Sequence, residues 1–158
     1  MRLTTRTNLA ARTLMFCAVN DGHLVRTSDI ANRCNASTNH VARVVQQLQA
    51  EGYLETLRGR TGGIRLARPA DRISIGAVFR MFETEIPFAE CFDPERNTCP
   101  LAATCRLQSY VVRALEAFYH ELDMVTLDDL VRGNCGLMDL LSMRPDFSAG
   151  CTASPATA

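Results

Sequence analysis

The stretch "STNHVARVVQQLQAEGYLETLRGRTGGIRLARPA", residues 37–70, places a helical pattern directly before a hairpin pattern. The apolar residues of its first half recur at helical spacing at Val41, Val44, Val45 and Leu48. This spacing predicts a helix with one buried face. Ser37 is the expected N-cap, and Gly52 is the expected end of the helix.

The second half of this stretch predicts two short strands. The strand-like segments 53–58 and 63–68 flank "GRTGG", residues 59–63, whose glycines permit the positive φ values of a hairpin turn. Pro69 then ends the segment.

Two further helices are expected upstream. Residues 3–19 carry an apolar stripe, and "NDGHL", residues 20–24, interrupts it. A short helix over residues 29–34, capped by Thr27 or Ser28, then leads tightly into the helix after Ser37. Two short helices joined by a tight link indicate a helix-turn-helix, and the following hairpin indicates a winged helix.

Composition indicates a folded protein of one domain, or of one domain with an appendage. The chain has 158 residues, of which 47% are hydrophobic and 22% are charged. We find neither a membrane-spanning run nor a signal peptide pattern, and therefore expect a cytoplasmic protein with no membrane partner. In that compartment the seven cysteines are expected to be reactive or metal-binding thiols and not disulfides.

Charge is divided between the two halves of the chain. Residues 1–72 contain 11 arginines and 5 acidic residues, a net charge of +6. Residues 73–158 contain 6 arginines and 12 acidic residues, a net charge of −6. The positive half is therefore expected to contact a polyanion.

The helix after Ser37 has a polar face typical of a DNA recognition helix. The candidate DNA-binding residues here are Ser37, Thr38, Asn39, His40, Arg43 and Gln46. Arginine, asparagine and glutamine can form bidentate hydrogen bonds to base edges, and the first turn is the end that such helices insert into the major groove. For this helix alone, a solvated polar face is an equal alternative.

The hairpin adds Arg58, Arg60 and Arg65 to the candidate DNA interface. Arginines on a slim loop can enter the minor groove or bind phosphates. Solvated surface arginines are the alternative. The helix pair, the hairpin and the charge asymmetry together favour double-stranded DNA as a partner.

Downstream of the hairpin the sequence predicts a helix over 74–83, a longer helix over about 101–125, and a last short helix over 126–133. Apolar residues of the long helix have coiled-coil spacing, which predicts a homodimer interface. The predicted interface residues are Val111, Leu115, Phe118 and Leu122. Packing of this seam within its own domain is the alternative.

The predicted fold class is therefore mostly α with a small β-hairpin: a winged helix-turn-helix plus a long dimerisation helix. We divide the chain into a winged-helix DNA-binding domain (1–72), a cysteine loop with the dimerisation helix (73–133) and a flexible C-terminal tail (134–158).

The segment "AECFDPERNTCPLAATCRL", residues 89–107, contains Cys91, Cys99 and Cys105. A structural zinc site usually has four ligands in closely spaced pairs, and no such pair is present. An iron–sulfur cluster tolerates a mixed ligand set, and three thiolates with one weaker ligand would leave an iron accessible, as suits a sensor. We favour the cluster, with zinc and unmetallated thiols as alternatives.

The other four cysteines are not assigned to the metal site. Cys17 falls within the apolar pattern of the first helix and Cys34 at the end of the second, and both are expected to be small core residues. Cys135 and Cys151 lie towards the C-terminus, and the sequence indicates no role for them.

Three segments together resemble the NsrR, IscR and RirA family of iron–sulfur transcription regulators: "MRLTTRTNLAARTLMF", the stretch 37–70 and the three-cysteine loop. The resemblance covers about residues 1–133. "NHVARVVQQL" with "RGRTGGIRL" most resembles NsrR, the nitric-oxide-sensing repressor. The "AECF…CPLAATC" loop and "CAVNDGHL" also resemble RirA, the iron-responsive repressor.

The resemblance implies a homodimer that binds a palindromic operator, with Cys91, Cys99 and Cys105 as cluster ligands. We expect a 4Fe-4S cluster in preference to 2Fe-2S. In NsrR-like proteins the fourth ligand is a carboxylate from the first helix of the partner protomer, and Asn8 occupies the matching position here. Because an amide oxygen is neutral and a poorer ligand, the alternatives are Glu85, Glu90, Asp93, water or a small thiol.

The resulting hypothesis is a repressor whose cluster senses nitric oxide. Release of the operator would then derepress genes of nitric-oxide detoxification or nitrogen-oxide metabolism. An iron-responsive repressor is the alternative, and an iron–sulfur redox carrier is more remote because it leaves the arginine-rich hairpin without a role. We expect no enzyme activity, since the sequence has no phosphate-binding glycine loop, HExxH pair or nucleophile elbow.

Overall fold

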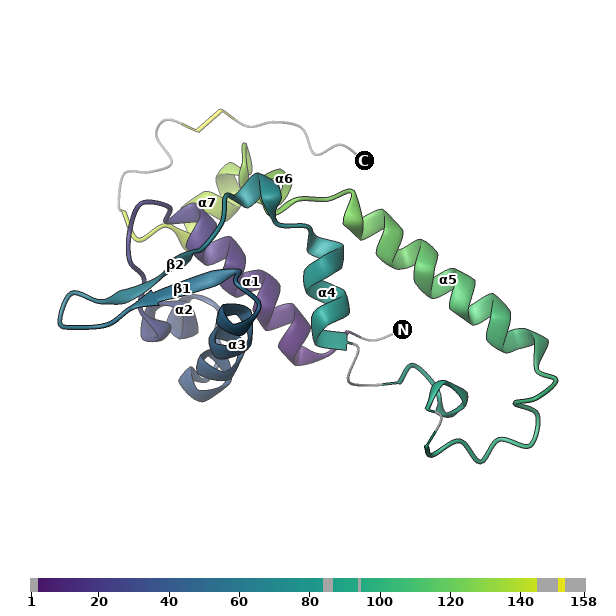
Figure 1. The fold of residues 1–158 in the computed structure, drawn as a ribbon. Coiled ribbons are helices and arrows are strands. Elements are labelled where there is room, and N and C mark those ends of the chain that lie inside the picture. Colours follow the sequence, from purple (N-terminus) through teal and green to yellow (C-terminus); the bar gives the residue numbers. More distant parts are fainter. Residues whose placement is uncertain (1–2, 84–86, 94, 145–150, 153–158) are drawn as a thin grey trace.

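The computed structural model describes residues 3–83, 87–93, 95–144 and 151–152 (Figure 1). Its elements are α1 (Thr5–Val19), α2 (Thr27–Arg33), α3 (Thr38–Ala50), β1 (Leu54–Leu57), β2 (Gly63–Leu66), the 3-10 turn η1 (Ala70–Arg72), α4 (Ile75–Glu83), the 3-10 turn η2 (Glu90–Phe92), α5 (Arg106–Asp123), α6 (Leu127–Val131) and α7 (Cys135–Leu141). The predicted class is confirmed: the described chain is mostly helical, with one antiparallel two-stranded hairpin.

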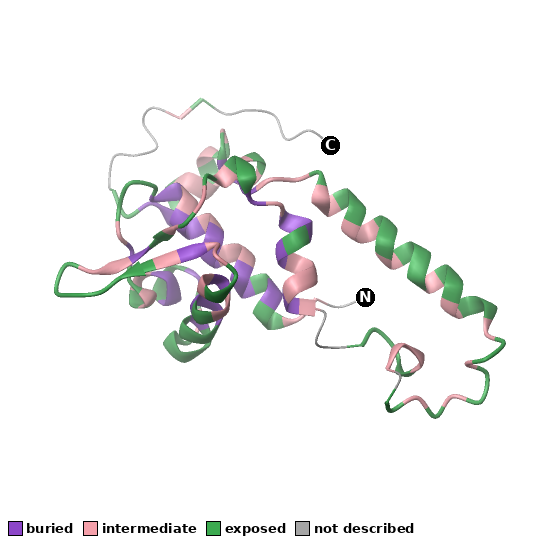
Figure 2. Ribbon diagram, in the orientation of Figure 1, coloured by how far each residue is buried: buried purple, intermediate pink, exposed green. Residues whose placement is uncertain are grey.

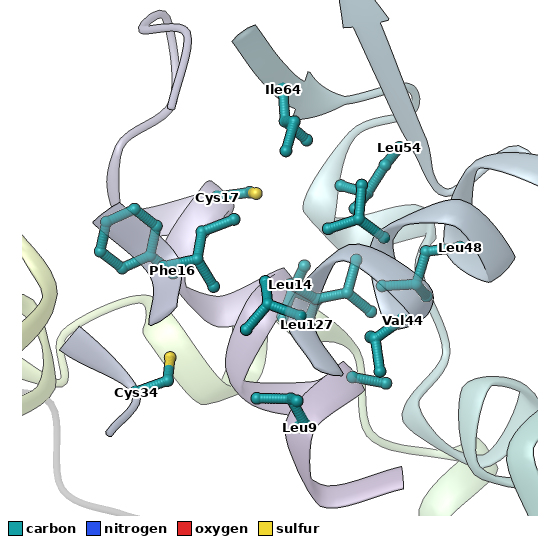
Figure 3. Packing of buried hydrophobic residues seen from close by; sticks show 14 of the residues in the cluster. Leu9, Leu14, Phe16, Cys17, Cys34, Val44, Leu48, Leu54, Ile64 and Leu127 are labelled. Atoms are coloured by element: carbon teal, nitrogen blue, oxygen red, sulfur yellow. The ribbon is translucent and has the colours of Figure 1, made fainter. Parts of the chain in front are cut away.

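Helix α1 lies at the centre of the core. Thr4 caps it, because the Thr4 hydroxyl accepts a hydrogen bond from the Thr7 backbone N–H at 3.1 Å. Leu14 and Phe16 are fully buried, and Leu9 is nearly so. Figure 3 shows these side chains among residues of α3, the hairpin and α6. One continuous apolar core therefore joins the helix-turn-helix to elements that come after the hairpin.

Helix α3 begins and ends where the sequence predicts. The Ser37 hydroxyl accepts a hydrogen bond from the His40 N–H at 3.2 Å, and Gly52 has a positive φ of 70° just beyond the helix. The predicted apolar stripe is buried. Its polar face is consequently directed away from the core.

The hairpin is joined to the segment before α2. Strand β1 pairs with β2 from Leu54↔Leu66 to Leu57↔Gly63. Val25 and Ile64 exchange backbone hydrogen bonds of 2.9 and 2.8 Å. A Cβ at Gly63 would lie only 2.8 Å from the Leu24 Cβ, so glycine permits this close approach. The hairpin thereby forms a wing that is fixed beside the helix-turn-helix.

Helices α4 and α5 approach closely at the C-terminal end of α5. A Cβ at Gly76 would overlap the Asp123 carboxylate and would lie 2.7 Å from the Asp123 backbone nitrogen. Arg80 forms an ion pair with Asp123 at 2.5 Å and stacks over the Tyr119 ring at 4.8 Å. This hydrogen-bonded ion pair lowers the pKa of Asp123. The rest of α5 extends away from the winged helix, and no α5 residue is buried (Figure 2).

The long helix begins later than predicted. Residues 99–104 form turns, with hydrogen bonds from Ala102 N to Cys99 O and from Thr104 N to Leu101 O. These are i to i−3 bonds, typical of turns and 3-10 geometry, so α5 starts only at Arg106.

The prediction that residues 134–158 form a flexible tail is wrong for residues 135–141, which form α7. This helix packs against α1 and buries Leu141. The prediction of unpaired cysteines is also wrong for Cys135 and Cys151, which form a disulfide. Helix α7 is short, and its docking on α1 gives it stability that local sequence pattern does not reveal.

Replacing Gly76 by alanine is expected to lower the free energy of unfolding by about 1–3 kcal/mol, because the new methyl group would overlap Asp123 and separate α4 from α5. Gly136→Ala is the matched control. A Cβ at Gly136, within α7, meets nothing within 4 Å, so this change should stabilise by about 0.4–1 kcal/mol. Urea unfolding of both variants measures the difference, and equal effects would contradict the close helix contact.

Candidate functional site

The candidate recognition residues lie together on the outer face of α3 and at its start. Ser37, Thr38, Asn39, His40, Arg43 and Gln46 are all exposed. The Ser37 hydroxyl is engaged in capping, so this residue fixes the start of the helix. Within the described part of the chain, the Arg43 guanidinium makes no hydrogen bond or ion pair. It can therefore contact a base edge or a phosphate without breaking an existing interaction.

The three wing arginines are not equivalent. Arg58 and Arg60 lie at the exposed tip of the hairpin and form no ion pair among the described residues. Arg65 lies directly across the ladder from Glu55 and donates a hydrogen bond from Nε to its carboxylate. The tip arginines are thus more available to a phosphate than Arg65 is.

A groove between the helix-turn-helix and the wing adds a residue that the sequence interpretation missed. Arg26, just before α2, lines this groove together with Arg60, Gln49 and Thr56. Gln49 Nε2 donates a 2.6 Å hydrogen bond to the Thr56 hydroxyl and so connects α3 to the wing. The position of Arg26 immediately before a predicted helix start was the available signal.

The three-thiol loop, of which the structure describes residues 87–93 and 95–105, lies between α4 and α5 at the end of α5 that is distant from α6 (Figure 1). Hydrogen bonds within the loop shape it. Glu90 accepts bonds of 2.6 Å from both the N–H and the hydroxyl of Thr98, which lower the Glu90 pKa. Gln108 of α5 donates a 2.7 Å bond to the Cys91 carbonyl. The loop is therefore tied to the first turns of α5.

Cys91, Cys99 and Cys105 are free thiols, and each is half-exposed. Within the described residues, however, no three Cys, His, Asp or Glu side chains lie close enough together to bind one metal ion. The chemistry of the donor set fits an iron–sulfur cluster, since three accessible thiols lie on one loop. Assembly of the site would require the loop to bring its three sulfurs closer together.

The candidate fourth ligands already have partners. The Asn8 side-chain oxygen accepts hydrogen bonds from Nε and Nη2 of Arg12, and Arg12 also donates to the Cys34 carbonyl at 2.7 Å. Asp93 accepts bonds from the N–H groups of Glu95 and Arg96. Glu90 is held by Thr98. Glu85 lies outside the described residues.

Cys17 and Cys34 are buried, as predicted for small core residues. Burial, with a smaller contribution from nearby Cys34, raises the pKa of Cys17 to about 12. Burial also raises the pKa of Cys34, although Arg12 opposes this shift. These two thiols are consequently poor nucleophiles and poor metal ligands.

The predicted dimer residues of α5 are half-buried: Val111, Leu115, Phe118 and Leu122. Leu122 packs against the main core. On an adjacent strip of the same helix, Leu107 and Tyr110 are 68% and 60% exposed. Their spacing, continued by Ala114 and Ala117, is a second coiled-coil-like series that the sequence interpretation missed.

No helix within the described residues is both long enough and apolar enough to cross a membrane.

Comparison with known proteins identifies related regulators. The model of the Rrf2 family, described as iron-dependent transcriptional regulators, matches residues 3–133. The chain is 40% identical to protein aau3 of Rhizobium meliloti over 153 residues, which cover 94% of this chain and 99% of that protein. It is also 40% identical to the HTH-type transcriptional regulator NsrR of Bacillus licheniformis, covering 90% of this chain and 100% of the relative.

Solved structures show the same fold. The global cysteine regulator CymR of B. subtilis matches with a TM-score of 0.65 at 23% identity, covering 83% of this chain and 96% of that chain. IscR of T. potens matches with a TM-score of 0.64 at 21% identity, covering 82% of this chain and 85% of that chain.

In iron-free protein, iodoacetamide is expected to modify Cys91, Cys99 and Cys105 rapidly at neutral pH. Cys17 should react more than about 100-fold more slowly, because its raised pKa leaves almost no thiolate. Peptide mass spectrometry after timed quenching measures each rate. Unfolding in guanidinium should remove the difference, whereas equal rates in the native protein would contradict the burial of Cys17.

Proposed function

The chain belongs to the Rrf2 family of winged-helix transcriptional regulators, and from that premise we propose that it is a homodimeric repressor whose three-thiol loop holds a nitric-oxide-responsive iron–sulfur cluster. The observation that supports this best is the similarity to several regulators named NsrR, at 35–41% identity over 90–92% of this chain. The chain is a DNA-binding transcriptional regulator. The cluster, the signal and the dimer are our proposals.

In the proposed complex, the first turn of α3 enters the major groove. Thr38, Asn39, Arg43 and Gln46 face outward and carry the donors and acceptors that read base edges. The exposed wing tip brings Arg58 and Arg60 to the DNA backbone or the minor groove. Arg26 and Arg60 line the groove between helix and wing and can hold a phosphate there.

Cys91, Cys99 and Cys105 are the proposed ligands of the cluster. When bound, the cluster would supply an iron that a small molecule such as nitric oxide can reach. Asn8 of the partner protomer could donate its side-chain oxygen only if the Arg12 hydrogen bonds rearranged. Water or a small thiol would complete the ligand set without that change.

The loop is well placed to influence the DNA-binding half. It follows α4 directly, α4 packs against α1, and α1 packs against α3. Loss of the thiolate bonds would free the loop between α4 and α5 and so change the restraint on α4. We propose that the relative position of the two recognition helices in the dimer depends on this restraint, since two half-sites require a fixed spacing.

The proposed dimer forms through α5. A helix with no buried residue and with large exposed apolar side chains, Leu107 and Tyr110 among them, is unusual for a protein that acts alone. A partner α5 would cover this strip, together with the half-buried seam from Val111 to Leu122.

Arg60→Ala is expected to weaken DNA binding and to reduce the slope of log affinity against log salt by about 1, as for loss of one phosphate contact. Arg65→Ala is the matched control. It removes the same charge from the same hairpin, but its guanidinium is held by Glu55, so its effect should be smaller. Fluorescence anisotropy with a duplex selected by the wild-type protein from a random-sequence pool measures both. Equal slopes for the two variants would contradict the proposed role of the wing tip.

Protein purified without oxygen is expected to show thiolate-to-iron absorption that collapses when nitric oxide is added, with DNA affinity falling at least tenfold, or about 1.4 kcal/mol. Anaerobic absorption spectra and anisotropy on the same sample, with the selected duplex, measure both changes. Cys99→Ser should lack the absorption.

Retention of the duplex after complete reaction with nitric oxide would overturn the proposed signal and leave DNA binding intact. The family description as iron-dependent favours a second candidate, an iron-responsive repressor. Release of the duplex by an iron chelator, but not by nitric oxide, would establish that alternative.

A further inference from the structure

Helix α7 and the residues just after it dock on the DNA-binding half. The buried Asn20 side chain, at the end of α1, donates hydrogen bonds to the carbonyls of Phe16 (2.9 Å) and Leu141 (3.0 Å) and accepts one from the Met143 N–H (2.9 Å). Leu141 is only 8% exposed. The end of α7 is thus specifically bound to the end of α1.

The same helix also contacts the helix-turn-helix itself. Arg33, the last residue of α2, donates a 3.1 Å hydrogen bond to the Leu140 carbonyl. Helices α1 and α2 both pack against the recognition helix α3. A docked α7 therefore braces the two helices that position α3.

A disulfide links the start of α7 to a residue that follows it in the C-terminal segment. Cys135, the first residue of α7, is bonded to Cys151, 16 positions later. Both residues are half-exposed, so a small solute can reach them. The other cysteines are free, and two of those, Cys17 and Cys34, are buried. The matched family model ends at residue 133, before both cysteines.

We propose that Cys135 and Cys151 form a thiol–disulfide exchange site that couples the redox state of low-molecular-mass thiols to the docking of α7, and through α7 to DNA affinity. Disulfides in a reducing compartment are usually transient and redox-sensing, which favours a reversible bond here. The site is separate from the three-thiol loop and requires no metal.

The exchange balances as a two-electron step. In the reduced chain, the thiolate of one cysteine attacks a sulfur of a small disulfide RSSR and expels one RS⁻, giving a mixed disulfide. The thiolate of the second cysteine then attacks the protein sulfur of that mixed disulfide and expels the second RS⁻. The two protein thiols are oxidised, RSSR is reduced, and the two protons from the protein thiols convert 2 RS⁻ to 2 RSH.

The direction of the effect follows from chain entropy. A seven-residue helix is too short to be stable alone, so α7 depends on its contacts with α1 and α2. Closing the ring restricts the undocked chain more than the docked chain and so favours docking. The oxidised protein is therefore the form with the better-fixed helix-turn-helix and the higher DNA affinity.

The test compares full-length wild type with Cys151→Ser after equilibration in reduced or oxidised glutathione. Three readouts are needed: differential alkylation with peptide mapping for the bond, hydrogen exchange of the Met143 amide for docking, and anisotropy with the duplex selected by wild-type protein for affinity. In wild type, oxidation should slow Met143 exchange at least tenfold and tighten DNA binding about three- to tenfold, through restricted undocking of α7.

Cys151→Ser retains every thiol of the three-thiol loop, so it separates the effect of the Cys135–Cys151 pair from the effect of the loop thiols. It should show neither change, and Cys135→Ser should behave alike. The proposal is overturned if the bond does not respond to glutathione, or if it responds while Met143 exchange and DNA affinity stay constant. It is also overturned if the redox effect persists in Cys151→Ser, because the loop thiols would then be its source.

Discussion

Packing on α1 is the constraint on which the rest of the structure depends. Helices α3, α4, α6 and α7 and strand β2 all contact this one helix. Its buried residues, such as Leu14 and Phe16, belong to a single core that extends without a boundary from the DNA-binding half to the helices after the hairpin. Because close-packed interiors transmit displacement, elements on opposite sides of α1 cannot move independently. The loop after α4 and the brace formed by α7 thus act on the same support.

Local chemistry made much of the fold predictable. The apolar stripe from Val41 to Leu48 and the Ser37 cap predict where α3 lies and where it begins. The glycine-rich residues 59–63 predict the turn of the hairpin. These features depend on neighbours in sequence, so sequence alone reveals them. The start of α5 was predicted too early because apolar residues in the loop extended the helical pattern across residues that form turns.

Features that depend on distant partners were less accessible. Helix α7 is held by a hydrogen bond from Asn20, which lies more than a hundred positions upstream. The Cys135–Cys151 disulfide conflicts with the expectation, drawn from the cytoplasmic compartment, that the cysteines are unpaired. The pairing of Arg65 with Glu55 follows from the register of the two strands. Counting residues outward from the predicted turn on both strands would have placed these two side chains opposite each other. The assembly of Cys91, Cys99 and Cys105 cannot follow from spacing alone, because contacts among the described residues do not bring the sulfurs together.

The contact between Gly76 and Asp123 gives α5 the geometry of a lever. The helix contacts the core at its last turn and has 18 residues, so its first residue lies about 27 Å from that contact. A rotation of about 5° at the fixed end displaces the free end by about 2 Å. Gly76 lets the backbones of α4 and α5 lie very close together at this contact. A small change in the orientation of α5 there therefore becomes a displacement of about 2 Å at Cys105, which precedes the first residue of the helix.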